Sequence, residues 1–188
     1  MRRLAAELDV GAMTLYGYFR TKDELLDAAV DLASDEIAIP PTDGPWREQM
    51  RALVTEILRV LRRYPVAHQV RAGRPLISPG ALRSTEAGME ILLGAGFSNA
   101  EAARAWRLLF TYVFGFAAFT PPELSLESRL ELGAKLAALS PDRLPRVADA
   151  AGEAVAAMGG DETFSYGLER ILAGLEASRT DERSSWRP

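Results

Sequence analysis

The chain has no cysteine and only one histidine, His68, among its 188 residues. Without thiols a protein can form neither disulfides nor thiolate metal sites, and a reducing cytoplasm is the compartment that suits it best. His68 alone cannot form a metal site, and neither a glycine-rich phosphate loop nor a recognisable nucleophile motif accompanies it. We therefore expect no cofactor, no metal and no enzymatic activity.

Long hydrophobic runs and strand-like patterns are missing as well. The most apolar stretch, residues 105–119, has 12 hydrophobic residues in 15 and is interrupted by Arg107 and Thr111. Because a membrane-spanning helix needs about 20 apolar residues, this stretch predicts a buried helix and no membrane partner. The first residues lack the apolar core of a signal peptide. Alternating Val, Ile and Thr runs between Asn-Gly turns are also missing, so we expect no sheet.

Helix signals are plentiful, and they predict an all-α protein. Thr21 with Glu24, and Ser98 with Glu101, match the capping box that starts helices. Apolar spacing and Pro or Gly breaks predict helices at 2–8, 12–19, 22–37, 46–64, 79–94, 99–119, 123–138, 141–158 and 161–177. The proline-rich segment 39–45 divides the chain into a head, residues 1–38, and a body, residues 46–178, and the polar residues 179–188 predict a flexible tail.

Residues 13–19 carry more large apolar side chains than one helix face can bury. At 100° per residue, Leu15 and Phe19 share the face that can pack against Leu4, Ala5 and Leu8 of the preceding helix. Val10, in the turn 9–11, is expected to fill the space between the two helices. Met13, Thr14 and Gly17 then face away from this small core, with Tyr16 and Tyr18 at its flanks.

Two short helices that share a core across a tight turn form a helix-turn-helix, whose second helix enters the DNA major groove. Outward hydroxyls can bond phosphate oxygens without carrying charge, and Gly17 lets the backbone approach DNA closely. The charge of residues 1–22 is +2, against −4 for the whole chain, which suits docking by one end. Spacing alone also allows an interior helical hairpin with the tyrosines at its rim.

The residues Leu4-Ala5, Leu8-Asp9-Val10, Thr14-Leu15-Tyr16, Phe19 and Lys22-Asp23-Glu24-Leu25-Leu26 resemble the tetracycline-repressor (TetR) family of transcriptional regulators. The resemblance implies a homodimer that binds a palindromic operator with two recognition helices, and a small-molecule effector in each body. Met13, Thr14, Gly17 and Tyr18 match groove-facing positions. Tyr16 and Lys22 match positions that bond phosphates, and Thr21 caps the next helix beside them.

The sequence departs from the family pattern at two points. The family usually has glycine where Asp9 stands, in a turn that often needs positive φ, which aspartate tolerates better than most residues. The family's head also begins with one more helix than this chain shows before Leu4. We expect that an upstream segment has been omitted, the alternative being a body with an incomplete head.

The body supplies candidates for an effector pocket and a dimer interface. The pocket candidates are apolar or aromatic residues, some with polar tips: Trp46, Met50, Leu53, Ile57, Tyr64, His68, Met89, Leu92, Trp106, Phe110 and Phe114. The resemblance implies that the helices near 99–119 and 161–177 pair across a two-fold axis, through Leu109, Val113, Phe116, Phe164, Leu168, Ile171, Leu172 and Leu175. Packing within a single core is the alternative for both sets.

The sequence therefore predicts a ligand-responsive DNA-binding regulator, most simply a repressor that a small apolar effector releases from its operator. The alternative from another class is a helical ligand-binding dimer without DNA-binding activity.

Overall fold

The computed structural model describes residues 1–65, 79–119, 125–139, 143–158 and 160–185, with side chains described up to Arg179. Within these ranges the protein is all-helical, as predicted, and contains no strand. The head consists of α1 (Arg2–Glu7), α2 (Ala12–Tyr18) and α3 (Lys22–Asp35). The body contains α4 (Trp46–Arg63), α6 (Pro79–Gly94), α7 (Asn99–Phe119) and α11 (Asp161–Ser185), together with α8 (Leu126–Ala137), α9 (Pro145–Asp149) and α10 (Ala151–Ala156).

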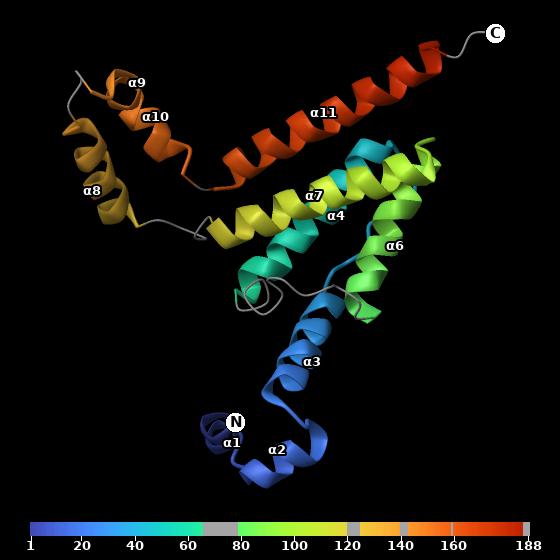
Figure 1. Ribbon diagram of the computed structural model, residues 1–188, viewed down its shortest axis with the longest axis vertical. Coiled ribbons are helices and arrows are strands. Elements are labelled where there is room, and N and C mark those ends of the chain that lie inside the picture. The colour runs from blue at the N-terminus through green and yellow to red at the C-terminus, as the bar shows by residue number, and fades with distance from the viewer. Residues whose placement is uncertain (66–78, 120–124, 140–142, 159, 186–188) are drawn as a thin grey trace.

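Helix α3 connects the head to the body. Figure 1 shows α1 and α2 at one end of the molecule and α3 running from them into the body, where it packs against α6. Thr21 Oγ1 accepts a hydrogen bond from Glu24 N at 3.0 Å, as the capping box predicts, while the Glu24 carboxylate accepts from Arg20 N at 2.7 Å. The N-terminal end of α3 is therefore capped where it leaves the helix-turn-helix.

The core lies between α4, α6, α7 and α11. Met50, Leu53, Leu92 and Leu109 are completely inaccessible to solvent. Gly88 of α6 lies against the Trp106 ring, and a β-carbon there would approach the ring to 2.2 Å. Because such a contact is impossible for real atoms, α6 and α7 pack closely only with glycine at this position.

The α8–α10 arm is separate from this core. Its three helices contact one another, and among their described residues only Ala151 is buried. The prediction of one helix over 141–158 is wrong, because Pro145 cannot lie inside a helix and instead starts α9, while Ala150 separates α9 from α10.

The C-terminal helix extends into the segment that was predicted as a flexible tail. α11 continues past residue 178 to Ser185. Arg179, where the tail was expected to begin, donates a hydrogen bond from Nη1 to the carbonyl oxygen of Ala95 at 3.2 Å and pairs with Glu176 one turn earlier. Polar composition alone did not reveal this anchor between the C-terminal helix and the body.

Candidate functional site

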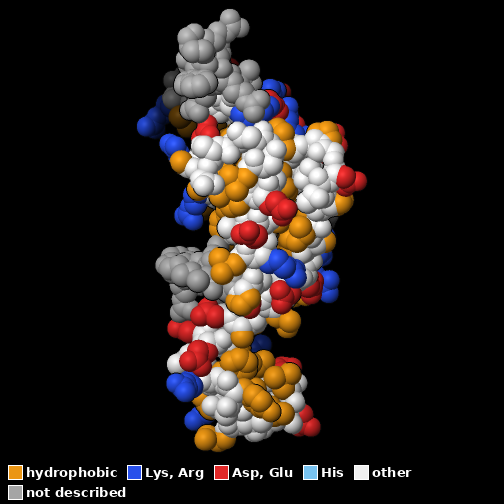
Figure 2. All heavy atoms as spheres, turned by 90° about the vertical axis from the view of Figure 1, so that its right-hand side faces the viewer, with side chains coloured by type: hydrophobic (Ala, Val, Ile, Leu, Met, Phe, Trp, Pro, Cys, Tyr) orange, Lys and Arg blue, Asp and Glu red, His pale blue; other side chains and the backbone are white. Residues whose placement is uncertain are grey.

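The seven candidate DNA-binding residues all lie on the surface of the head. Leu15 is buried and Phe19 half-buried, whereas Met13 and Tyr18 are each 80% exposed. Tyr16, Thr14, Gly17, Thr21 and Lys22 are exposed as well. Figure 2 shows hydrophobic side chains gathered over this end of the molecule. Such a face suits contact with a partner better than a role in the chain's own core.

The turn between α1 and α2 has the geometry expected of Asp9. Its φ is +51°, in the left-handed region, where aspartate is better tolerated than most residues. The expectation for Val10 is wrong, because this side chain is 40% exposed and does not fill the space between the helices. Leu8 is 56% exposed, so the small core rests on Ala5 and Leu15.

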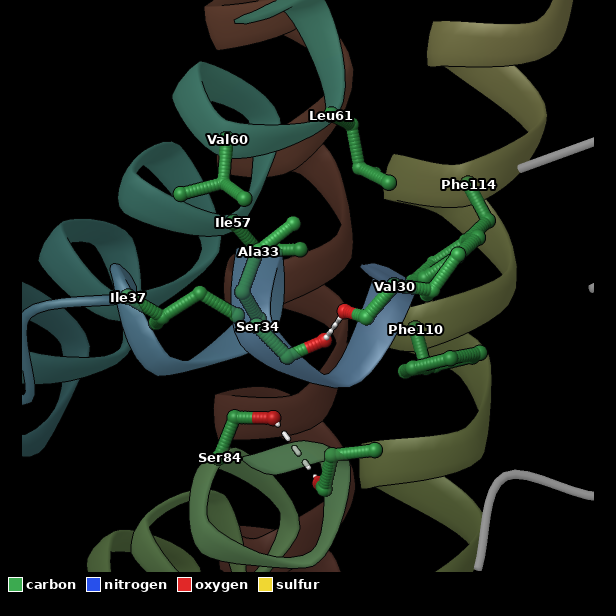
Figure 3. Close-up of a pocket in the computed structure, with 11 residues that line it drawn as sticks. Val30, Ala33, Ser34, Ile37, Ile57, Val60, Leu61, Ser84, Phe110 and Phe114 are labelled. Atoms are coloured by element: carbon green, nitrogen blue, oxygen red, sulfur yellow. Dashed lines mark hydrogen bonds between the residues drawn. The ribbon is translucent and has the colours of Figure 1, made fainter. Parts of the chain in front are cut away.

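A cavity lies where the connecting helix α3 enters the body. Its volume is about 30 Å³, room for about two water molecules. The wall is formed by α3 and the residue two beyond its end, together with α4, α6 and α7, and consists of Val30, Ala33, Ser34, Ile37, Ile57, Val60, Leu61, Ala81, Ser84, Phe110 and Phe114 (Figure 3). None of these residues is charged.

The polar groups of this wall are two serines. Ser34 Oγ donates to the carbonyl oxygen of Val30 at 2.8 Å, and Ser84 Oγ donates to that of Ala81 at 3.0 Å. Opposite them, the rings of Phe110 and Phe114 stack with centroids 4.1 Å apart. The described wall therefore favours an uncharged, largely apolar ligand.

Three of the eleven pocket candidates, Ile57, Phe110 and Phe114, line this cavity. The structure does not bring the other described candidates to it. Met50, Leu53, Leu92 and Trp106 are buried in the core, and Met89 packs against it partly buried. Trp46 contacts Phe97 edge-to-face and lines a separate surface groove beside Gln49 and Glu90. His68 lies outside the described residues.

Tyr64, the residue that follows α4, is not among the residues that line the cavity. Its hydroxyl donates to Glu36 Oε1 at 2.5 Å, and this hydrogen bond raises the pKa of Tyr64. Five residues before it, Arg59 donates to both carboxylate oxygens of Glu56 at 2.7–3.0 Å, and this hydrogen bonding lowers the pKa of Glu56. The Tyr64–Glu36 bond joins the residue that follows α3 to the residue that follows α4, whereas the Arg59–Glu56 pair lies within α4.

The contribution of α3 to the cavity was not predicted from the sequence, where this helix was expected only to connect the head with the body. Val30, Ala33, Ser34 and Ile37 follow the i, i+3, i+4, i+7 spacing of one helix face. That spacing was the available signal, since a helix that only connected two domains through solvent would not need an apolar face.

The predicted dimer residues fall into two groups. Leu109, Val113, Phe164, Leu168 and Leu172 are at most 2% exposed within the single chain. Their assignment to a dimer interface is therefore corrected, because they fill the chain's own core between α7 and α11 and leave no surface for a partner. Phe116, Ile171 and Leu175 are partly buried at the edge of that core.

Comparison with known proteins settles the family. The model of the tetracyclin repressor-like C-terminal domain matches residues 40–179, and that of the bacterial regulatory proteins of the tetR family matches residues 1–29. The chain belongs to the TetR family. The predicted function is thereby confirmed: it is a ligand-responsive, DNA-binding transcriptional repressor of this family.

Relatives in sequence and structure agree with this assignment. The chain is 32% identical to the transcriptional repressor DrrR1 of Streptomyces coeruleorubidus over 100% of its own length and 73% of the relative's. It is 34% identical to an HTH-type transcriptional regulator of Saccharopolyspora erythraea, over 95% of its own length and 76% of the relative's. The structure of ActR from Streptomyces coelicolor with actinorhodin superposes with a TM-score of 0.79 at 29% identity, covering 95% of this chain and 87% of ActR.

No enzyme is among these relatives, which are transcriptional regulators. In the described residues no group of three or more potential metal ligands occurs. Of the helices that the structure describes, none combines the length and apolarity needed to cross a membrane.

Proposed function

We propose that this TetR-family regulator acts in the cytoplasm as a homodimer that binds a palindromic operator through α2, and that a small, uncharged apolar effector releases it by entering the α3–α4–α6–α7 cavity. One observation carries the proposal: α3 both lines the cavity and holds the helix-turn-helix. A ligand in the cavity would contact the helix that positions the DNA-reading side chains. Actinorhodin, bound to ActR, is an example of a small molecule held by a structural relative.

The roles of the DNA-facing residues can be separated by selection from random duplexes followed by binding measurements. Tyr16→Phe and Lys22→Ala should weaken binding to all sequences alike, because these side chains would contact phosphates. Met13→Ala and Thr14→Ala should change which sequence is preferred. Lys135→Ala is the control, because the Lys135 side chain is 70% exposed on α8, in the body. If Tyr16→Phe and Lys22→Ala bind like wild type, the docking model is wrong.

The homodimer would use the outer faces of α7 and α11. Leu108 is 48% exposed on α7 although it lies in the most apolar helix, and Gly174 of α11 has open space where a β-carbon would stand. An isologous interface pairs such faces with themselves. Leu108→Glu should convert dimers to monomers in analytical ultracentrifugation. Leu82→Glu, at a leucine 47% exposed on α6, should not.

The effector site can be tested by a thermal-shift screen of uncharged apolar compounds, run with and without the selected duplex. Hits should raise the melting temperature of the free protein and release the DNA, since the two ligands oppose each other by linkage. Phe114→Ala should diminish these responses. Phe119→Ala, at a phenylalanine 89% exposed on the same helix, should leave them intact. Compounds that bind a chain unable to select any DNA would favour the alternative, a ligand-binding dimer.

A further inference from the structure

Helix α2 lacks the side chains that most often distinguish one base from another. Specific recognition in the major groove relies mainly on Arg or Lys with guanine, Asn or Gln with adenine, and Asp or Glu with cytosine. The sequence of α2 is AMTLYGY, so none of these residue types occurs in it. The hydrogen-bonding side chains that α2 does carry are the hydroxyl groups of Thr14, Tyr16 and Tyr18.

The outward face of α2 is apolar at its centre. Met13 and Gly17 are four residues apart, so they lie one turn apart on the same face of the helix, opposite the buried Leu15. The Met13 side chain is 80% exposed. A β-carbon on Gly17 would meet nothing within 4 Å. Because Gly17 has no side chain, the flexible thioether of Met13 has room to lie along the helix surface.

The positive charges of the head lie outside α2. Arg2 and Arg3 belong to α1, Lys22 is the first residue of α3, and Arg20 lies between α2 and α3. The chain leaves the helix at Phe19, where φ is −129° and ψ is 118°, so Arg20 does not continue the outward face of α2. Cations placed beside a recognition helix suit phosphate oxygens, which contribute affinity but carry no direct sequence information.

One group in the major groove matches an apolar side chain, the C5 methyl of thymine. Guanine, cytosine and adenine present only hydrogen-bond donors and acceptors there. A methionine pressed against those groups would cover them without bonding them, which costs free energy. The same side chain against a thymine methyl removes apolar surface from water, which is favourable. The hydroxyl of Thr14 can bond either base of a neighbouring pair.

We infer that this regulator selects its operator through thymine methyl groups, which Met13 contacts in each half-site while Gly17 lets the helix surface lie close to them. The inference rests on the proposed function, in which α2 enters the major groove, and names the base that its outward face would read. Met13 is then a specificity-determining residue, whereas Arg20 and Lys22 add affinity that is common to all sequences. The competing interpretation is that Arg20 reads guanine and Met13 makes no base contact.

Deoxyuridine isolates the methyl group, because it differs from thymidine only by a hydrogen at C5 and pairs with adenine in the same way. The full chain first selects a duplex from random sequences, and the fixed positions of its half-sites should include T·A pairs. Each of these thymines is then replaced by deoxyuridine, and affinities are measured by fluorescence anisotropy at one salt concentration. Loss of a contacted methyl should weaken binding about fourfold, the scale of one buried methyl group. Replacement of thymines outside the half-sites is the control and should have no effect.

Variants of Met13 show whether this residue makes the methyl contact. Met13→Ala should weaken binding to the thymine duplex but bind the deoxyuridine duplex like wild type, because protein and DNA changes remove the same contact. Met13→Leu stays apolar and should keep the deoxyuridine effect. Met13→Gln has a similar length but ends in an amide, and should lose that effect. Met158→Ala is the matched control, because Met158 is a methionine of the body that is 45% exposed.

Three results would overturn the inference: deoxyuridine duplexes that bind like the thymine duplex, half-sites fixed only at G·C pairs, or a deoxyuridine effect that is undiminished in Met13→Ala. Arg20→Ala should weaken binding to all duplexes alike. If it changes the preferred sequence instead, the competing interpretation holds.

The deoxyuridine comparison uses the wild-type chain, so it decides even where a variant fails to fold. A wild-type chain that selects no duplex would overturn the proposed function, and the inference with it. A chain that selects a duplex without any dependence on thymine methyl groups would leave the proposed function standing and overturn the inference alone.

Discussion

The helix-turn-helix and the body use apolar side chains for opposite purposes. In α1 and α2 the buried residues are Ala5 and Leu15, while large apolar side chains stand exposed at Leu8, Val10, Met13, Tyr16 and Tyr18. In the body the large apolar side chains Met50, Leu53, Leu92 and Leu109 are inaccessible to solvent. Burying such a side chain contributes about 1.5–3 kcal/mol. The body therefore gains stability by burying residue types that the helix-turn-helix leaves exposed on its surface.

Helix α3 belongs to both regions. Val30 and Ala33 are buried against the body, while Lys22, Asp23 and Glu24, at its first turn, are exposed beside α2. In the described part of the chain, a change in body packing can therefore alter the position of the helix-turn-helix only through α3 or the residues around it. Substitutions on the two sides should accordingly affect different measurements, stability for the body and DNA binding for the head.

The largest effect is expected in the body core, where adjacent leucines form a matched pair. Leu92→Ala should lower the free energy of unfolding by about 2–5 kcal/mol, since Leu92 is fully buried, whereas Leu93 is 40% exposed. Leu93→Ala should cost less than about 1 kcal/mol. Chemical denaturation followed by circular dichroism measures both. Equal losses would contradict the packing of α6 described above.

Alanine substitutions at Gly88 in the body and Gly17 in the head should have opposite effects on stability. Gly88→Ala should destabilise the body by about 1–3 kcal/mol, because the new methyl group overpacks the Trp106 ring. Gly17→Ala meets nothing within 4 Å and should raise helix propensity by about 1 kcal/mol. Yet it should weaken operator binding if the α2 backbone approaches DNA at Gly17. Denaturation and DNA titration of both variants, side by side, would reveal this reversal. A Gly17→Ala protein that is less stable than wild type would contradict the open position of that glycine.

The head could be read from the sequence largely because its outward residues are unusual. Met13, Tyr16 and Tyr18 exceed what one helix face can bury, and the cap at Thr21 follows a local rule that needs no tertiary contact. Val10 is more exposed than predicted. Helical periodicity predicts the direction in which a side chain points, but it does not predict whether another residue covers that side chain.

The body was harder to interpret, because apolar residues on helices look alike whether they face a core, a cavity or a partner. Leu109 and Phe164 satisfied the pattern of a dimer interface, but long-range packing of α7 on α11 buries them within the chain. Ser34 and Ser84 were missed as cavity residues, because their place depends on the crossing of α3 and α6. Such crossings depend on contacts distant in sequence, which helical spacing does not encode.

Removal of the side-chain N-cap from α3 in the head and from α7 in the body should have an intermediate effect on stability. Thr21 Oγ1 accepts from Glu24 N at 3.0 Å, and Ser98 Oγ accepts from Glu101 N at 3.3 Å. Thr21→Ala and Ser98→Ala should each cost about 1 kcal/mol. Ser98→Ala should lower the free energy of global unfolding, because α7 is part of the core. Thr21→Ala should instead cause faster amide hydrogen exchange over residues 22–26, with little change in the unfolding midpoint. Equal midpoint losses would indicate that head and body unfold as one unit.

The smallest effect concerns the ion pairs that join α4 to α11. Arg51 Nε and Arg47 Nη2 donate to the two Glu169 carboxylate oxygens at 2.5 and 3.1 Å. The hydrogen bond from Arg51 is the main cause that lowers the pKa of Glu169 below its usual 4.5. The carboxylate therefore stabilises the fold above about pH 4.5, and this contribution is lost as the pH falls through the lower folded-state value.

Glu169→Gln should thus lower the melting temperature near neutral pH and converge with wild type as the pH drops below 4.5. Since the Glu169 side chain is 39% exposed, the difference should stay within the about 1 kcal/mol of a surface pair, or about 2–4 °C. Glu162→Gln, at an exposed position on the same helix, is the control. A difference between wild type and Glu169→Gln that grows on acidification would contradict the ion pair. Because these residues lie in the body, operator affinity of Glu169→Gln at neutral pH should match wild type, which keeps stability and DNA binding separable even for the weakest contact.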